Sequence, residues 1–308
     1  MLNYIQSKLQ TRYFLDFGNY KNTVLVAGTG RSGTTWIQDV INQDGSYRTM
    51  FEPFHSKKIG LLKSWNYRQY LRVNDKNPKY LKPAATILGG KIRDPWIDQF
   101  NTKILTNKRL IKDIRINLFL KWIKLNFPEI PIVLLFRHPC AVASSKLVLG
   151  WETHLDDFLS NDELVIDFLA PYKKDILSAK NPFEKHIFAW CIENYVPLNQ
   201  FSPGEILVIF YENLCLNPTQ NMHDISEFLG LFRPVYSSDI FSKPSIMSRE
   251  DSAIMSQSNP VENWRKYMGD QQIRKAVEIL SLFGMEKVYN DENLPLLSAN
   301  EALELFSV

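Results

Sequence analysis

The feature that most constrains this chain is the stretch at residues 23–42, TVLVAGTGRSGTTWIQDVIN. A run of β-branched and apolar residues opens it, and a helical pattern begins at about Thr34. Between them lie three glycines, Gly28, Gly30 and Gly33. Glycines let the backbone reach positive φ and approach a ligand closely, so successive N–H groups and the start of the helix converge on one point. The stretch therefore predicts a strand, a glycine loop and a helix that bind a phosphate or a similar oxyanion.

Two other nucleotide-binding loops share part of this spacing. Residues 28–33 followed by Thr34 match the triphosphate loop GxxxxGK[ST], but a threonine stands where the lysine belongs, which disfavours a nucleotide kinase or another NTPase. The same glycines fit the fingerprint GxGxxG of an NAD(P)-dependent oxidoreductase, and Glu52 lies about 20 residues onward, where a ribose-binding acid would sit. Against that interpretation, Trp36 is bulky for the start of the helix, and the hydroxyls of the loop suit oxyanion oxygens.

Basic side chains are concentrated in one segment, although the net charge of the 308-residue chain is only +3. Residues 57–93 hold ten Lys or Arg residues and one acid, Asp75, with tyrosines and a tryptophan between them. Such a segment could bind an anionic glycan, single-stranded nucleic acid, or nothing, as a solvated face whose aromatic residues point into the core. A non-catalytic binder of an anionic polymer would rest on this segment alone, and we expect no nucleic-acid partner.

The cysteines and the N-terminal residues indicate the compartment. Cys140, Cys191 and Cys215 are odd in number and lack CxxC spacing, which favours reduced thiols over disulfides or a zinc site. Residues 1–22 hold no apolar run long enough for a signal peptide or a membrane anchor. We therefore expect a cytoplasmic protein without a membrane span or a required metal.

Strand and helix patterns alternate along most of the chain. Their order predicts an α/β fold, a single domain with a central parallel sheet flanked by helices. The later strands are expected at 47–51, 108–114, 130–136 and 206–210, and the main helices at 117–126, from Pro139 onward, and at 183–198, 219–230 and 270–284.

A second strand-to-helix junction narrows the class of ligand expected at the first one. The strand at 130–136 ends in Arg137, and Ser145 follows eight residues later in FRHPCAVASSKL. Together with GTGRSGTTW, this segment resembles the sulfotransferases that use 3′-phosphoadenosine-5′-phosphosulfate (PAPS). In that family the first loop holds the 5′-phosphosulfate, and an arginine and a serine at these positions hold the 3′-phosphate. Further resemblance lies in IFYENLCLNP, where Tyr211 would lie near the adenine, and in ENWRKYM, where Trp264 and Arg265 would cover the donor.

Within the family, RSGTTW and FEPFH together with RHPCAVASS are most similar to carbohydrate sulfotransferases. The resemblance covers about residues 23–55 and 108–285 and implies a P-loop-like sulfotransferase fold for one domain, 1–308. Residues 56–107 would then be a basic insertion that shapes the acceptor site. The implied reaction moves a sulfuryl group from PAPS, without a metal, to an acceptor hydroxyl on a carbohydrate, with an anionic glycan as one candidate.

The resemblance also implies a set of site residues. An acceptor hydroxyl loses its proton during in-line attack, so a carboxylate general base is expected, with Glu52 first, His55 second and Asp113 third. Arg31 would neutralise charge on the bridging oxygen, and Lys112 would contact the transferred sulfate. The residues expected to bind the donor are Gly30, Arg31, Ser32, Gly33, Thr34, Thr35, Trp36, Arg137, Ser145, Tyr211, Trp264 and Arg265.

The chain departs from the cytosolic sulfotransferases of phenols and steroids. Those enzymes carry a lysine where this chain has Arg31 and a catalytic histidine where it reads KDI at 112–114. His138 also replaces the aspartate usual after the arginine. These differences place the chain outside that branch and leave the base to be assigned.

Overall fold

Five parallel strands form the centre of the structure, a computed structural model that describes residues 15–231 and 259–307. Among those residues the central sheet has the strand order β3-β5-β2-β6-β7, and all neighbouring strands are parallel. This sheet confirms the predicted α/β fold of one domain. Its strands are β2 (Thr23–Gly28), β3 (Arg48–Phe51), β5 (Arg109–Asp113), β6 (Ile132–Phe136) and β7 (Leu207–Phe210).

The strands end at nearly the same level, which brings the loops after them to one edge of the sheet. Ala27 near the end of β2 pairs with Asp113 at the end of β5. Gly28 pairs with Leu135 near the end of β6 on the other side. Ligands of parallel α/β sheets bind at this carboxyl edge, so the register alone places both strand-to-helix junctions beside one site.

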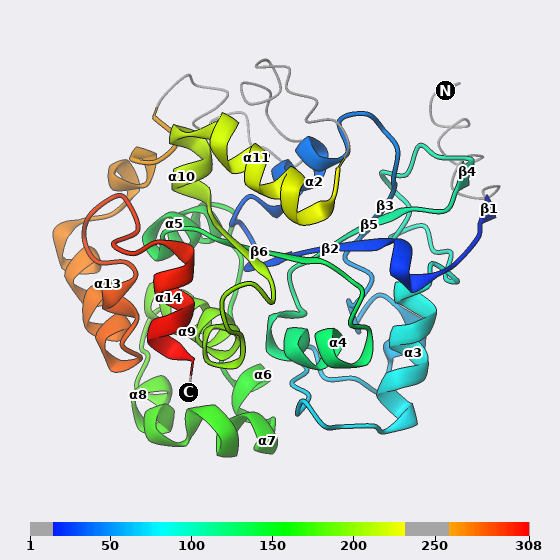
Figure 1. The fold of residues 1–308 in the computed structure, drawn as a ribbon. Coiled ribbons are helices and arrows are strands. Elements are labelled where there is room, and N and C mark those ends of the chain that lie inside the picture. Colours follow the sequence, from blue (N-terminus) through cyan, green and yellow to red (C-terminus); the bar gives the residue numbers. More distant parts are fainter. Residues whose placement is uncertain (1–14, 232–258, 308) are drawn as a thin grey trace.

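Helices cover both faces of the sheet (Figure 1). Alternate side chains of the strands enter two separate hydrophobic clusters, which is why the strands read as continuous apolar runs. One face carries α2 (Thr34–Ile41), α10 (Tyr211–Leu216) and α11 (Pro218–Leu229), and the other carries α4 (Leu120–Asn126) and α9 (Pro182–Gln200).

Two helix boundaries confirm local signals in the sequence. Pro139 occupies the first turn of α5 (Pro139–Val148), and the Nδ1 of His138 accepts a hydrogen bond from the Cys140 amide over 3.2 Å. Gly230 ends α11 in the left-handed region, at φ 62°. The remaining elements are β1 (Leu15–Asp16), α3 (Pro78–Leu88), β4 (Leu105–Thr106), α6 (Asp156–Leu159), α7 (Asp162–Leu164), α8 (Lys173–Leu177), α13 (Asp270–Leu282) and α14 (Ala299–Phe306).

The basic segment is attached to the sheet by a buried ion-pair network and by aromatic packing. Arg48 on β3, fully buried, bonds Asp98 over 2.9 Å and the Gly90 carbonyl over 2.8 Å. Trp65 and Tyr70 lie in the main core, whereas Tyr67 remains partly exposed. The aromatic residues of this segment are therefore divided between packing and surface.

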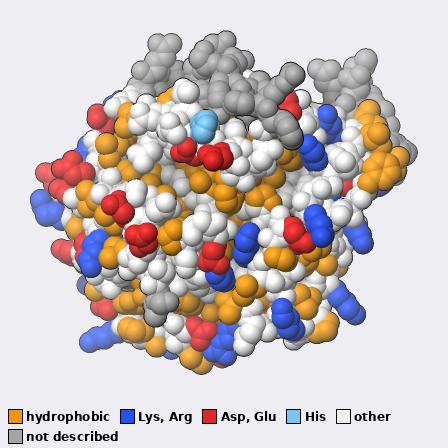
Figure 2. Space-filling view, in the orientation of Figure 1, with side chains coloured by type: hydrophobic (Ala, Val, Ile, Leu, Met, Phe, Trp, Pro, Cys, Tyr) orange, Lys and Arg blue, Asp and Glu red, His pale blue; other side chains and the backbone are white. Residues whose placement is uncertain are grey.

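Figure 2 shows Lys and Arg side chains spread over the face in view, with acidic side chains between them. Among the described residues, no helix combines the length and the apolar composition needed to cross a membrane. Residues 232–258, which the expected sulfotransferase core includes, lie outside the described residues.

Candidate active site

The loop between β2 and α2 has a shape that two glycines make possible. Gly33 caps α2 at φ 101°, and a Cβ there would lie 2.8 Å from the Tyr211 ring. A Cβ on Gly28 would lie 2.6 Å from the Leu135 carbonyl oxygen. Ser32 donates its hydroxyl proton to the Thr29 carbonyl over 2.7 Å, so this side chain holds the loop.

The same loop also presents polar groups that make no hydrogen bond to the described residues. The amides and hydroxyls of Thr34 and Thr35 have no hydrogen-bond partner among the described residues. Helix α2 begins at Thr34, so its first N–H groups point out of the helix toward the loop. Arg31 has φ 75°, a strained value for a residue with a Cβ, which the surrounding contacts must hold in place. These features are those of an oxyanion site.

The second junction contacts the first one directly. Arg31 donates from Nε to the Ser145 Oγ over 3.0 Å, and Arg137 donates from Nη1 to the Arg31 carbonyl over 3.1 Å. The Arg137 guanidinium also lies 4.3 Å from the centre of the Tyr211 ring, which packs edge-on against Trp36. The buried Nε of Arg137 has no partner among the described residues. Five of the residues predicted to bind the sulfuryl donor PAPS therefore lie in one cluster: Arg31, Trp36, Arg137, Ser145 and Tyr211.

Trp264 lies next to this cluster through His138. It belongs to the 3₁₀ helix η6 (Asn263–Tyr267) and stacks on the His138 ring at 4.4 Å, with the planes 14° apart. Burial lowers the pKa of His138 to about 3, so the ring is neutral and serves as a packing surface. The buried Trp264 Nε1 has no partner among the described residues.

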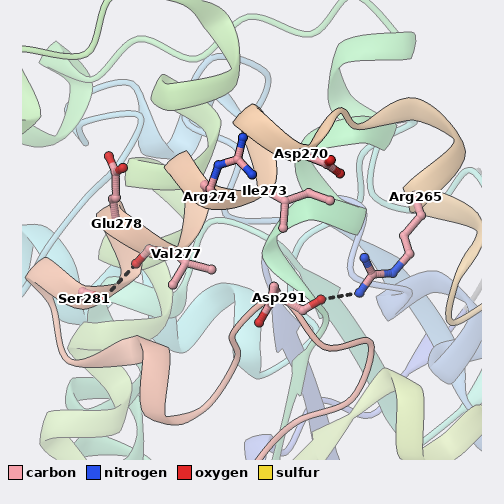
Figure 3. A pocket seen from close by; sticks show the side chains of 8 residues that line it. All are labelled: Arg265, Asp270, Ile273, Arg274, Val277, Glu278, Ser281 and Asp291. Carbon is pink, nitrogen blue, oxygen red and sulfur yellow. Dashed lines mark hydrogen bonds between the residues drawn. The ribbon is translucent and has the colours of Figure 1, made fainter.

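Arg265 points to a different place. Its guanidinium bonds Asn293 Oδ1 over 2.7 Å and the Asp291 carbonyl, and it lines a surface cavity of about 540 Å³ beside α13 (Figure 3). The other lining residues are Asp270, Ile273, Arg274, Val277, Glu278, Ser281 and Asp291. The cavity includes no residue of the glycine loop. Arg265 contacts the predicted PAPS-binding residues only through Trp264 among the described residues, with its guanidinium carbon 4.6 Å from the centre of the Trp264 ring.

Glu52 lies at the end of β3, between two cations. Lys112 Nζ is 2.6 Å from Oε1, and Arg115 Nη1 is 2.5 Å from Oε2. Burial alone would raise the pKa of the Glu52 carboxyl, but Lys112 and Arg115 together hold this pKa below its ordinary value. Glu52 is therefore ionised at neutral pH. Its backbone has φ 45°, a second strained residue at the carboxyl edge.

His55 and Asp113 are the other two candidate bases. Burial, followed by the Arg115 charge, lowers the pKa of His55 to about 4, so its ring is neutral, and its Nδ1 is buried without a partner among the described residues. Asp113 is fully buried, and burial raises its pKa to about 6. Its two oxygens accept the amides of Phe54 over 2.7 Å and Arg115 over 2.9 Å, so it holds the loops behind Glu52.

Three residues near the carboxyl edge of the sheet were not predicted as site residues from the sequence: Arg115, Tyr67 and Trp151. Arg115 follows Lys112 just past the end of β5, a position that could have marked it as a site residue. Tyr67 accepts a hydrogen bond from Arg115 over 3.1 Å. A Cβ on Gly30 would lie 3.0 Å from the Trp151 ring, which places this indole against the glycine loop. No local signal distinguishes Tyr67 or Trp151 from the other aromatic residues.

The fold and these contacts define an α/β protein whose two strand-to-helix junctions meet at the carboxyl edge of a parallel sheet, the edge where such sheets bind ligands. A sequence model described as "Sulfotransferase family" matches residues 23–234. The chain therefore belongs to the sulfotransferase family.

Solved structures of sulfotransferases resemble the chain at low identity. The sulfotransferase domain from the curacin biosynthetic pathway is 14% identical, with 88% of this chain and 98% of that chain covered and a TM-score of 0.42. A mouse sulfotransferase complexed with PAP is 12% identical, with coverages of 98% and 94% and a TM-score of 0.45. The sulfotransferase domain of the Synechococcus PCC 7002 olefin synthase is 15% identical, with coverages of 85% and 94% and a TM-score of 0.44. No curated protein sequence matches significantly.

Proposed function

We propose that this protein is a PAPS-dependent sulfotransferase that transfers a sulfuryl group to a hydroxyl of a carbohydrate. The observation that carries the proposal is the contact between the two junctions, in which Arg31 bonds Ser145 and Arg137 bonds the Arg31 carbonyl. A donor with phosphates at both the 5′ and the 3′ positions gives each junction its own anion. A dinucleotide or a triphosphate leaves Arg137 and Ser145 without a task.

The polar atoms without partners match such a donor. The amides and hydroxyls of Thr34 and Thr35 would hold the 5′-phosphosulfate, with Arg31 at the bridging oxygen. Arg137 and Ser145 would hold the 3′-phosphate, because a guanidinium forks onto phosphate oxygens. Among the other proposed donor residues, Gly30, Ser32 and Gly33 shape the loop, Trp36, Tyr211 and Trp264 surround the adenosine, and Arg265 would have to leave its bonds to the 291–293 segment.

The transfer itself needs in-line positioning and one proton acceptor. The acceptor oxygen attacks sulfur, the bond from sulfur to the 5′-phosphate oxygen breaks, and 3′-phosphoadenosine 5′-phosphate (PAP) leaves. Glu52 takes the proton of the acceptor hydroxyl, while Lys112 contacts the sulfuryl oxygens. A carboxylate with a lowered pKa suits a loose transition state, in which the hydroxyl proton is released late. His55, neutral and with an unpaired Nδ1, is the alternative base, and Asp113 is the third candidate.

The aromatic residues near the proposed transfer site suit a sugar as the acceptor. Tyr67, Trp96 and Trp151 lie around His55 and the glycine loop, and aromatic rings of this kind stack on sugar faces. Residues 56–107 supply two of the three rings, which supports their role in shaping the acceptor site. An anionic glycan remains the first candidate class because the segment is basic, and no nucleic-acid partner is proposed.

The proposed location is the cytoplasm. The three cysteines are free thiols, which suits a reducing compartment.

The proposed reaction uses no metal. Among the described residues, no group of three or more His, Cys, Asp or Glu side chains could hold a metal ion.

The structure weighs against the dinucleotide alternative, and the sequence weighs against the nucleotide kinase. Strand β5 separates β3 from β2, and Glu52 is held by Lys112 and Arg115, so it does not face the glycine loop as a ribose-binding acid would. The lysine that a nucleotide kinase requires is missing from the loop.

Transfer of label from radiolabelled PAPS to a panel of neutral and acidic oligosaccharides tests the proposal. A phenol and a steroid serve as acceptor controls. Transfer of label to a sugar that is lost in Glu52→Gln supports the proposed reaction and the role of Glu52. Label only in the phenol or the steroid contradicts a carbohydrate acceptor.

A further inference from the structure

Arg68 has a guanidinium that is anchored at one end and unpaired at the other. Its Nη1 lies 2.6 Å from Glu193 Oε1 on α9 and donates to the Ile114 carbonyl over 3.3 Å. Its Nε and Nη2 have no hydrogen-bond partner among the described residues. The side chain is 16% exposed, so the guanidinium is not sealed inside the core.

Aromatic rings hold this guanidinium in place. Its central carbon lies 5.3 Å from the centre of the Tyr67 ring and 5.4 Å from that of Phe158. Cation–π contacts and the Nη1 anchors fix the orientation of the planar group before any ligand arrives. A fixed guanidinium with a free edge matches the two oxygens of a carboxylate or of a sulfate ester.

Lys146 adds a second basic side chain to the same cluster. Its side chain, on α5, is buried, and its ammonium has no hydrogen-bond or ion-pair partner within residues 15–231 and 259–307. Burial lowers the pKa of Lys146, Glu193 raises it and Arg68 lowers it further, so the three groups share one environment. Two basic side chains therefore share one carboxylate, Glu193. An anion bound beside them would favour the charged form of Lys146 and would pair with Arg68.

The cluster lies beside the proposed transfer site. Tyr67 contacts both Arg68 and Arg115, with its ring centre 5.1 Å from the Arg115 guanidinium carbon, and Arg115 binds Glu52. Ile114, whose carbonyl anchors Arg68, approaches the position of a Cβ on Gly30 to 3.1 Å. The Tyr67 ring thus links Arg68 to the Arg115–Glu52 pair, so we expect an acceptor bound at Glu52 to lie near Arg68.

We propose that Arg68, with Lys146 behind it, is a specificity site that binds an anionic group of the acceptor, a carboxylate or a sulfate ester on a sugar. This inference rests on the proposed sulfotransferase function and names the acceptor class of that same site. The proposal distinguishes Arg68 from the surface cations of the basic segment, since only an anchored guanidinium selects for geometry as well as charge.

Three sugars that differ in one substituent test the proposal on the full chain: octyl glucuronide, octyl glucose 6-sulfate and octyl glucoside. We expect kcat/KM with radiolabelled PAPS to be about tenfold or more higher for an acidic sugar than for the glucoside, as for a charge-assisted hydrogen bond. Comparison of the glucuronide with the 6-sulfate decides between the two anions. Arg68→Gln and Arg68→Lys should remove most of this preference through KM, because neither side chain supplies the fork.

Controls separate specificity from folding and from the proposed function. Arg72→Gln is matched, since Arg72 lies in the same segment and pairs with the exposed Asp167, and it should leave the preference unchanged. Arg68→Lys keeps a cation beside Glu193, so it decides the matter if Arg68→Gln fails to fold. Equal rates for the three sugars, or a preference that survives Arg68→Lys, overturns the inference.

Binding of the sugars to the PAP-saturated protein covers the case in which none is turned over. Glucuronide or 6-sulfate binding that is lost in Arg68→Lys supports the site, and the absence of such binding overturns it. Failure to bind PAP at all would instead count against the proposed function.

Discussion

Arg31 and Ser145 are separated by 114 residues in the chain, yet a hydrogen bond of 3.0 Å joins the Arg31 Nε to the Ser145 Oγ. The bond connects the loop after β2 with the helix after β6, the neighbouring strand of the sheet. A ligand that binds at one junction therefore lies beside the side chains of the other junction as well.

Ser145→Ala should weaken PAP binding about tenfold, because it removes a hydroxyl donor and an anchor of Arg31. Ser144→Ala is the matched control, since Ser144 is the preceding residue of α5 and, within the part of the chain that the structure describes, its buried hydroxyl bonds only the Ala141 carbonyl over 3.1 Å. Isothermal titration with PAP measures both variants. Equal losses in the two would show that Ser145 acts through helix stability rather than at the donor.

Glu52→Gln should lower turnover by about a hundredfold or more, the contribution of a general base, while PAP still binds. His55→Gln should change turnover only a few-fold if Glu52 takes the proton. Single-turnover rates with saturating PAPS measure the two effects, and thermal melting shows whether Lys112 and Arg115 tolerate the uncharged partner. Full turnover in Glu52→Gln with donor bound would transfer the role to His55 or Asp113.

Gly33→Ala should cost several times more stability than Gly45→Ala. Both glycines have positive φ, 101° and 61°, so each variant strains the backbone by about 1 kcal/mol or more. Only at Gly33 would the new Cβ also meet an aromatic ring, Tyr211 at 2.8 Å, whereas nothing lies within 4 Å at Gly45. Denaturant unfolding compares the two, and similar losses would mean that Tyr211 moves aside freely.

Lys146→Met should raise the free energy of unfolding at neutral pH by about 1–2 kcal/mol, because methionine carries no cost of burying a basic amine, a cost that the lowered pKa of Lys146 reflects. Burial places the pKa of Lys146 in the folded state below its unfolded value. Between those two values the folded chain binds fewer protons, so wild-type stability rises with pH and the advantage of the variant shrinks. Urea unfolding at several pH values measures this trend, with the exposed Lys63→Met as control. A loss of stability in Lys146→Met would indicate that the lysine stabilises the fold.

Local sequence signals predicted the elements that form the donor site. The glycine spacing around Gly33, the apolar runs of β2 and β6, and Pro139 after Arg137 each act over a few residues, so the two junctions could be placed from the sequence alone. Their adjacency followed from the rule that parallel strands carry ligands at one edge.

The acceptor side could not be read in the same way, because its contacts join distant segments. Glu52 meets Arg115 across 63 residues, and Arg68 reaches Glu193 on α9 through tertiary packing. In the basic segment, no periodicity separates the buried Trp65 from the partly exposed Tyr67, since most of this segment lies outside helices and strands. Arg265 was expected at the donor, but in the structure it bonds the 291–293 segment, a tertiary contact without a local signal.

Calorimetric titration with PAP, 5′-AMP and NAD tests the central claim most directly. The wild-type protein should bind PAP tightly and 5′-AMP weakly, because only PAP carries the 3′-phosphate that Arg137 and Ser145 receive. Arg137→Ala should lose this binding while its melting temperature stays close to that of the wild type. Binding of NAD without binding of PAP, or PAP binding that is unchanged in Arg137→Ala, would contradict the account.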